Sequence, residues 1–287
     1  MHNITDAARL EALRQSQRLP LASLPNAREL GGYVMADGRR IRRGLLLRTT
    51  QLANASPDDL ARLADTYHVR LVLDMRGERE IEKTPDPEIP GARWVHDPII
   101  DFVSLNSLAA KTQGHEEEAV DIERNMTPEI VRSLVDNGFF ADSYKSYLES
   151  AFGQAGFRLF FREILALDSG AVLWHCLTGK DRTGLGAALL LTALGADEAL
   201  VFADYELSNL FFAAECAASE QRFLSQGYPA EQAEQLAAIY HGVSAEQLRR
   251  AWDYLNSAWG SPEGYLRGAL GLGDGDFAAL RERYLEN

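Results

Sequence analysis

The sequence predicts an α/β protein in which helices cover both faces of a mostly parallel central sheet. Three observations lead to this fold class. Short apolar, β-rich runs occur at 44–48, 69–73 and 171–175; amphipathic helical stretches separate them; and everything after residue 183 has a helical pattern. Parallel strands need crossover connections long enough to hold a helix, so this alternation favours a parallel sheet with helical additions at the C-terminal end.

The elements of the N-terminal part of the chain can be predicted one after another. Residues 1–20 are expected to form a polar, partly helical lead-in, and residues 33–39 a strand that runs into a tight turn. After the strand at 44–48, the run Ser-Pro-Asp-Asp at 56–59 begins a helix, because it supplies a capping hydroxyl, a first-turn proline and two acids at the positive end of the helix dipole.

The second half of the sheet follows. The run at 69–73 shows little polar alternation, which predicts a strand buried on both faces. A short strand is expected at 94–98, and residues 101–126 are the least regular part of the chain. Helical patterns at 128–137, 141–152 and 155–167 lead to the strand at 171–175. We find no internal repeat, which favours one domain over 1–287.

Composition narrows the class of protein. The chain has 46% hydrophobic and 25% charged residues, as an ordinary globular protein does. No apolar stretch approaches the ~20 residues of a membrane span, and the N-terminus lacks a signal-peptide pattern. Two cysteines cannot build a disulfide framework, so we expect a reducing compartment and, by default, the cytoplasm.

The net charge of −13 disfavours nucleic acid and acidic membranes as partners. The acidity is uneven, since residues 1–100 hold 15 basic and 14 acidic side chains. Ligands of such sheets bind at the carboxyl ends of the strands. We therefore expect Arg48, Arg76, Lys180 and Arg182 to set the field at a strand-end site, because distant carboxylates are screened beyond about 8 Å.

The strongest motif follows the strand at 171–175: Cys-Leu-Thr-Gly-Lys-Asp-Arg-Thr-Gly at 176–184, then a helix through residue 194. The N–H groups of such a loop can converge on an anion at the helix N-terminus. Gly179 would allow the turn, and Arg182 could hold two phosphate oxygens. The expected phosphate-loop residues are Leu177, Thr178, Gly179, Lys180 and Thr183, with Arg48 and Arg76 as further substrate-binding candidates.

Cys176 is the expected nucleophile. A positive field stabilises the thiolate, and a thiolate beneath a bound phosphate can take the phosphoryl group, giving a phosphocysteine that water hydrolyses. The competing interpretation is a buried cysteine beside an ordinary turn. Other chemistries find little support: the six histidines lack paired metal-ligand spacing, there is no Cys-x-x-Cys pair, and no nucleotide-binding glycine loop occurs.

The run 175–184 resembles the signature loop of cysteine-dependent protein tyrosine phosphatases. More closely, it is similar to the bacterial atypical family described as triple-specificity, which acts on phosphotyrosine, phosphoserine or phosphothreonine, and phosphoinositides. Further similar blocks lie at 24–33, 47–50, 72–80 and 264–272, so the resemblance covers most of the chain. The family usually has Asp where Glu29 stands, and the block at 47–50 has threonine where the family has serine.

The resemblance implies a tyrosine-phosphatase-like fold and a phosphomonoesterase that needs no metal or cofactor. It implies a phosphorylated protein or phosphoinositide as substrate and inorganic phosphate as product. Because such families include secreted effectors without ordinary signals, secretion by another route stays open. Related phosphatases carry a helical lid near 229–259, and an ordinary packed helix pair is the alternative there. A phosphate- or phosphoinositide-binding module with little turnover is the alternative function.

The reaction also needs a carboxylic acid to protonate the leaving group. The resemblance implies that Asp181, inside the loop, can serve; Asp74 is the rival and Asp97 a third candidate. Alternatively, Asp181 forms a salt bridge within the loop, and Asp74 is a turn partner of Arg76. Geometry decides between them.

Four other residues need an interpretation. Lys180 and Thr183 each have a functional and a structural one, whereas His175 and Cys216 have a structural one. Lys180 resembles a lysine of lipid phosphatases of the phosphatase-and-tensin type, or it simply holds the loop. Thr183 either donates to the sulfur or caps the helix. His175 is expected to shape the loop, and Cys216 to lie in the core on one long helix with Phe211 and Phe223.

Overall fold

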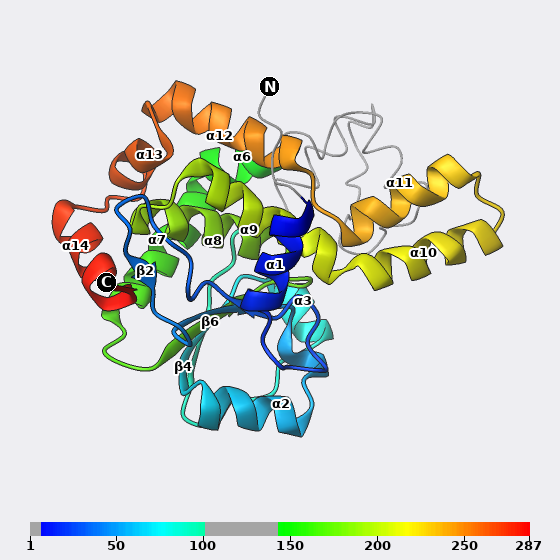
Figure 1. Cartoon of the computed structure of the whole chain (residues 1–287), viewed down its shortest axis with the longest axis horizontal. Coiled ribbons are helices and arrows are strands. Elements are labelled where there is room, and N and C mark those ends of the chain that lie inside the picture. The colour runs from blue at the N-terminus through cyan, green and yellow to red at the C-terminus, as the bar shows by residue number, and fades with distance from the viewer. Residues whose placement is uncertain (1–6, 101–142) are drawn as a thin grey trace.

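The computed structural model describes residues 7–100 and 143–287. Its centre is a five-stranded sheet in the order β1 (Arg28–Glu29), β3 (Leu46–Thr49), β6 (Ala171–His175), β4 (Val69–Asp74) and β5 (Arg93–His96). β1 is antiparallel to β3, and the other neighbours are parallel. Helices lie on both sides of the sheet (Figure 1), so the predicted fold class is confirmed.

Alternate side chains of the strands feed two separate cores. On β6, Val172 and Trp174 belong to the larger cluster, whereas Ala171 and Leu173 belong to the smaller one. The period of two along a strand sends neighbouring residues to opposite faces. A strand with apolar residues at every position therefore needs cover on both faces, which is why the run at 171–175 lacks polar alternation.

The smaller core is covered by the first half of the chain. Its cover includes a 3-10 turn at Leu52–Asn54, α2 (Pro57–Ala61) and a π-helical turn at Arg62–Thr66. The same half of the chain also contains α1 (Ala7–Gln17), whose Leu13 packs against the larger core, and the exposed α3 (Glu78–Lys83). Ser56 caps α2, since its hydroxyl accepts from the N–H of Asp59 at 3.2 Å. The helix start predicted from 56–59 is confirmed.

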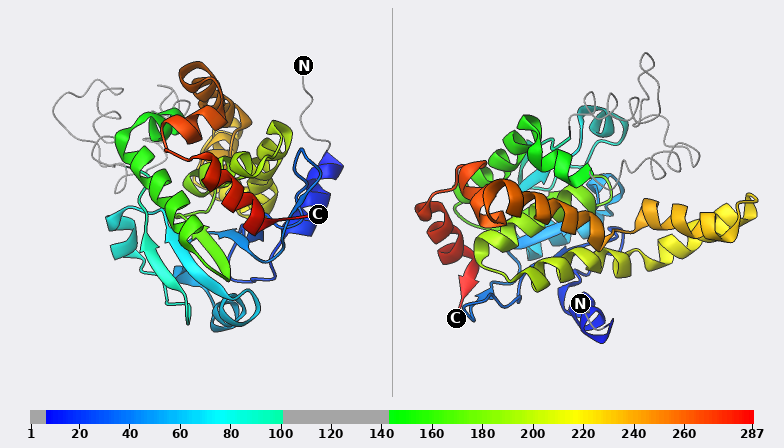
Figure 2. Two further views of the ribbon diagram at one scale, coloured as in Figure 1. Left: turned by 90° about the vertical axis from the view of Figure 1, so that its left-hand side faces the viewer. Right: turned by 90° about the horizontal axis from the view of Figure 1, so that it is seen from above.

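The larger core is covered by the second half of the chain, which the views of Figure 2 show wrapped over one face. Its helices are α6 (Ser143–Glu149), α7 (Ala151–Ala166), α8 (Asp181–Leu194), α9 (Glu198–Phe211), α10 (Ala213–Ser225), α11 (Ala230–His241), α12 (Ala245–Trp259), α13 (Pro262–Gly268) and α14 (Asp274–Tyr284). A two-stranded sheet joins β2 (Arg40–Ile41) to β7 (Leu285–Glu286).

Several sequence expectations need correction. The run at 33–35 makes only an isolated bridge, Val34 to Arg40, and Val34 is exposed. The helix expected over 141–152 ends before Ser150, whose hydroxyl instead accepts from Gly153 and starts α7. The chain after residue 183 is not entirely helical, because β7 closes it. The expectations for 101–126 and 128–137 lie outside the described residues.

The helices near 229–259 separate into two environments. α10 and α11 form a hairpin that projects from the body (Figures 1 and 2), with its own small cluster around Phe223, Ala233 and Leu236. α12 instead buries Leu248 and Trp252 in the larger core. Of the two helices in the predicted lid, only α11 belongs to the projecting hairpin.

This separation predicts different costs for two phenylalanines. Phe160→Ala, in the larger core, should lower the free energy of unfolding by about 3–5 kcal/mol in urea titrations. Phe223→Ala should change the global value by less than about 1 kcal/mol but speed amide hydrogen exchange across α10 and α11, because the small cluster can open locally. Equal global losses in both variants would show that the hairpin unfolds with the body.

Candidate active site

Parallel registration brings the predicted strand ends together. Thr49 on β3 and Asp74 on β4 both lie opposite His175 on β6. The chain leaves β6 through Cys176, which is 1% exposed, and enters α8 at Asp181. Cys176, the segment 177–183 and the strand-end residues thus share one edge of the sheet. Cys216 lies on α10 and is half-buried outside the larger core, so its expected core position is wrong. Phe211 ends α9 and Phe223 lies on α10, so the single long helix expected to carry them is two helices.

The loop at 176–180 requires glycine at residue 179. Gly179 has a φ of +68°, a region that other residues adopt rarely, and a Cβ there would lie 2.2 Å from the carbonyl oxygen of Thr49. This close approach presses the loop against the end of β3. The carbonyl of Gly179 then accepts from Arg48 Nη2 and from Asn26 Nδ2, both at 2.9 Å.

The backbone N–H groups of the loop lack backbone partners in the part of the chain that the structure describes. Within the described residues, those of Leu177 through Thr183 donate no backbone hydrogen bond, and the first bond of α8 runs from Gly184 to the carbonyl of Lys180 at 3.0 Å. A helix N-terminus leaves such donors without intrahelical partners. Successive unbonded N–H groups at a helix N-terminus are a general anion-binding arrangement.

Arg182 is held by a partner that the sequence interpretation did not assign. Its Nη1 and Nη2 donate to the two oxygens of Glu80 at 2.5 and 2.8 Å. Burial by itself would raise the pKa of Glu80, but Arg182 outweighs burial and the pKa is lowered, so the pair stays charged. Glu80 also accepts from the N–H of Gly77 at 2.8 Å. The sequence feature that could have identified Glu80 is its position as an acid in the first turn of the helix that follows β4.

Arg48 lies behind the loop rather than over it. It is fully buried, and its Nη1 donates to Asp204 of α9 at 2.6 Å. Arg28 forms a second buried ion pair with the same carboxylate at 3.1 Å, and Tyr33 donates to it at 3.0 Å. Neither Arg28 nor Asp204 was identified from the sequence, because they are 176 residues apart and nothing local marks them.

The guanidinium of Arg76 is also engaged by protein groups. Its Nη2 lies 2.7 Å from Asp74 and 2.8 Å from Asp86, and its Nη1 donates to Gln51 at 2.8 Å. His175 lies beside these acids, with Nε2 3.1 Å from Asp86. Asp74, Asp86 and His175 are close enough to ligate a metal ion, but the guanidinium of Arg76 already supplies a cation to both carboxylates.

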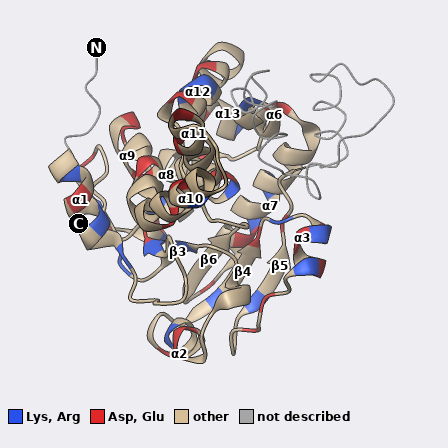
Figure 3. Cartoon of the chain, turned by 90° about the vertical axis from the view of Figure 1, so that its right-hand side faces the viewer, with Lys and Arg blue, Asp and Glu red and all other residues tan. Residues whose placement is uncertain are grey.

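The expectation that local cations set the field at the site therefore needs correction for the three arginines. Figure 3 shows basic and acidic residues together around α3 and the strand ends. Arg48, Arg76 and Arg182 each face a buried carboxylate, so their charges are largely balanced within the protein. Lys180 contacts neutral carbonyls, so its charge, the loop N–H groups and the dipole of α8 make the main positive contribution at the loop.

Three carboxyls were candidates for the acid, and they differ in environment. Asp74 is fully buried; burial alone would raise its pKa, but hydrogen bonds from Arg76 outweigh it and the pKa is lowered. Asp97 is also fully buried, and burial, followed by the charge of Glu163, raises its pKa well above the ordinary value. Asp181 alone of the three is partly exposed, and it accepts from Tyr144 at 2.6 Å.

Lys180 connects the loop to the helical hairpin. Its Nζ donates to the carbonyls of Ile239 and Gly242, each at 2.7 Å, at the C-terminal end of α11. Basic groups commonly bind these last helical carbonyls. Thr183 is fully buried, its Oγ1 has no hydrogen-bond partner within the described chain, and its carbonyl accepts from Trp174.

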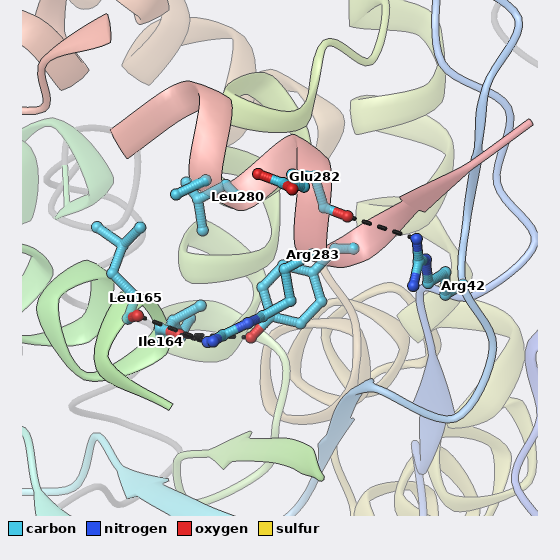
Figure 4. Close-up of a pocket in the computed structure, with 8 residues that line it drawn as sticks. Arg42, Ile164, Leu165, Leu280, Glu282 and Arg283 are labelled. Carbon is cyan, nitrogen blue, oxygen red and sulfur yellow. Dashed lines mark hydrogen bonds between the residues drawn. The ribbon is translucent and has the colours of Figure 1, made fainter. Parts of the chain in front are cut away.

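A pocket of about 370 Å³ lies elsewhere, between the ends of α7 and α14 (Figure 4). Arg283 reaches across it to the carbonyls of Ile164 and Leu165. These residues precede β6, so the pocket lies toward the amino end of that strand, opposite the loop. Across 7–100 and 143–287, no helix is long and apolar enough to cross a membrane.

Comparisons with known proteins agree with this arrangement. A model of the tyrosine phosphatase family matches residues 19–286. A Cupriavidus necator protein provisionally named a tyrosine-protein phosphatase is 32% identical over 271 residues, covering 93% of this chain and 88% of its own. The triple specificity protein phosphatase PtpB of Mycobacterium tuberculosis is 29% identical over 249 residues (80% and 87%), and a tyrosine-protein phosphatase of Nostoc commune is 28% identical over 234 residues (81% and 70%).

The buried pairs beneath the loop predict an acid-sensitive stability. Burial alone would raise the pKa of Asp204, but Arg28 and Arg48 outweigh it and the pKa is lowered. A lowered folded-state pKa gives stability that is present above the unfolded value of about 3.9 and is lost as pH falls through the folded value. Urea unfolding between pH 7 and pH 3 should show this loss.

Asp204→Asn should remove that part of the pH dependence and, at pH 7, cost about 3–5 kcal/mol, because two buried guanidiniums lose their carboxylate. Asp274→Asn, at an exposed ion pair with Arg267, is the matched control and should change stability by less than about 1 kcal/mol. An Asp204 variant with the wild-type pH profile would contradict this account.

Proposed function

Since the chain belongs to the tyrosine phosphatase family and is a protein tyrosine phosphatase, we propose that it works through a phosphocysteine intermediate on Cys176. One observation carries this proposal: directly after Cys176, from the end of β6 into the first turn of α8, the N–H groups of residues 177–183 donate no backbone hydrogen bond within the described residues. Such a loop can bind a phosphoryl group against the sulfur, and it leaves the leaving group pointing away from the sheet.

In the first step, the thiolate of Cys176 attacks phosphorus. The S–P bond forms as the bond to the leaving oxygen breaks, and a carboxylic acid gives its proton to that oxygen. In the second step, water attacks the phosphocysteine, the same carboxylate accepts a proton from the water, and the S–P bond breaks to release phosphate and thiolate. Each role belongs to a side chain, so the proposed reaction requires no metal or cofactor.

Arg182 is proposed to hold the phosphoryl oxygens. Glu80 fixes one edge of its guanidinium, and within the described residues Nε has no hydrogen-bond partner. A planar guanidinium held on one side can offer its remaining N–H groups in a set direction, which suits a phosphoryl group with spread negative charge. Arg48 and Arg76 are proposed to position the loop and the end of β4, because their terminal Nη1 and Nη2 groups are engaged with protein oxygens.

Asp181 is the proposed acid. An acid must carry a proton when the substrate is bound, which disfavours Asp74, because its carboxylate is ionised between Arg76 and the protein interior. Asp97 is buried against α7, where a Cβ at Gly156 would lie 3.3 Å from its Oδ1. Asp181 lies at the first position of α8 and remains partly exposed beside the loop.

Phosphotyrosine is the proposed first substrate, with phosphoserine, phosphothreonine or phosphoinositide as further ones. The name of the Mycobacterium tuberculosis relative, a triple specificity phosphatase, supports a broader range. The position of Lys180 supports its role in holding the loop more than in binding an inositol phosphate, because its ammonium is engaged by two carbonyls.

The cytoplasm is the proposed location. Both cysteines are free thiols, as expected in a reducing compartment.

The nucleophile is tested with an aryl phosphate in excess chelator. The wild-type enzyme should turn over there, and Cys176→Ser should lose activity by several orders of magnitude while binding phosphate within about threefold of wild type. Cys216→Ser is the matched control and should keep full turnover. An active Cys176→Ser enzyme would exclude the phosphocysteine, and a wild-type enzyme that binds phosphate without turnover would support a binding module.

The acid is tested by comparing Asp181→Asn with Asp74→Asn. Asp181→Asn should lower kcat by about 10²–10⁴-fold and remove the limb of the pH profile that reports the general acid. Asp74→Asn should keep that limb and instead lose about 1–3 kcal/mol of stability, because Arg76 loses one of its two carboxylates and keeps Asp86. The reverse pattern would assign the acid to Asp74.

A further inference from the structure

Two buried tyrosines form a hydrogen-bonded chain that ends on Asp181. The hydroxyl of Tyr144 on α6 donates to Asp181 Oδ1 at 2.6 Å, and the hydroxyl of Tyr205 on α9 donates to Tyr144 at 2.8 Å. The rings meet edge to face with centroids 6.0 Å apart. Tyr144 is 2% exposed and Tyr205 1% exposed, so the chain is shielded from water up to the carboxyl itself.

The carboxylate end of the chain determines its direction. A carboxylate oxygen without a proton can only accept a hydrogen bond. The hydroxyl of Tyr144 therefore donates to Asp181 and accepts from Tyr205. With one hydrogen bond accepted and one donated, the hydroxyl of Tyr144 is held in one orientation.

Both phenols keep their protons. Burial first, and then the charge of Asp181, raise the pKa of Tyr144 and of Tyr205 well above the ordinary value. Tyr144 therefore stays a hydrogen-bond donor near neutral pH. The length of its bond to Asp181, 2.6 Å, falls in the range of hydrogen bonds to a charged acceptor.

The loop is also joined to the connector between α11 and α12. Asn209 of α9 donates to the carbonyl of Val243 at 3.1 Å and accepts from its N–H at 2.7 Å. The preceding residue, Gly242, accepts from Lys180 of the loop. The connector is thus joined to the loop through Lys180, the residue that precedes Asp181, and to α9 through Asn209.

We propose that Tyr144 is a positioning residue that fixes the carboxyl plane of Asp181 and reserves Oδ2 for the catalytic proton. This inference rests on the proposed role of Asp181 as the acid. Because Oδ1 already accepts from Tyr144, a proton carried by the carboxyl resides on the other oxygen. The acid is then presented to the leaving group in one orientation instead of several, which is how preorganisation raises a rate.

Tyr144 acts in both steps of the reaction. In the first, Asp181 gives its Oδ2 proton to the leaving oxygen, and the hydrogen bond from Tyr144 stabilises the carboxylate that forms. In the second, Oδ2 takes a proton from the attacking water, which restores the acid. Tyr144 retains its own proton throughout, so it contributes by orientation and charge stabilisation and does not itself transfer a proton to substrate.

The test is a series of aryl phosphates whose phenol leaving groups range from strongly to weakly acidic. Tyr144→Phe should lower kcat about 10- to 100-fold for the weakly acidic leaving groups, the value of one hydrogen bond to a charged group, with little change in KM. The most acidic leaving groups depart without protonation, so their kcat should change less than about threefold. Tyr265→Phe is the matched control, since it removes a buried phenol that donates to α6 at Leu148 without contacting Asp181.

Three outcomes would overturn the proposal. Tyr144→Phe could resemble Tyr265→Phe, it could lower kcat equally across the series, or it could reduce activity as much in an Asp181→Asn background as in wild type. If Tyr144→Phe fails to fold, Tyr205→Phe should show a smaller loss of kcat with the same dependence on the leaving group. A loss of kcat in Tyr205→Phe that is equal across the series would also contradict the proposal. An inactive wild-type enzyme, or Asp181→Asn with an unchanged profile, contradicts the proposed function instead.

Discussion

The contact between Gly179 and the end of β3 sets the conformation on which the site depends. The Cα of Gly179 approaches the carbonyl of Thr49 so closely that no side chain fits, and the carbonyl of Gly179 is fixed from behind by Arg48 and Asn26. With this oxygen occupied and directed toward the interior, the neighbouring N–H groups are left for the other side. Arg48 and Asn26, which bind the inward carbonyl of Gly179, therefore determine the conformation of the loop.

That requirement explains why so much charge is buried beneath a site for an anion. Arg48 can reach Gly179 only from the protein interior, and a buried guanidinium needs a carboxylate, which Asp204 supplies. The same logic places Arg76 between Asp74 and Asp86, and Arg182 against Glu80. Each arginine is placed accurately because its partner is fixed, and the positive contribution left for a phosphoryl group comes from backbone dipoles and from Lys180, which contacts only neutral carbonyls among the described residues.

The helical hairpin of α10 and α11 is connected to this loop although its apolar cluster is separate. Lys180 binds the last carbonyls of α11, and Asn209 of α9 binds the connector that follows α11. A segment with few apolar contacts to the body is the part of a protein that opens most readily. Its attachment to Lys180 couples any such opening to the nucleophile loop.

The sequence by itself determined the fold class, the position of β6 and α8, and the loop from Cys176 to Arg182, because each of these is local: strand periodicity, a turn glycine and a helix start lie within one short segment. It also placed Asp74, Arg48 and Arg76 at strand ends. The tertiary structure alone decided their partners. Asp204, Glu80, Tyr144 and the connector at 242–244 meet the loop from distant parts of the chain, and side-chain pairing over such separations leaves no periodic or local signal in one sequence.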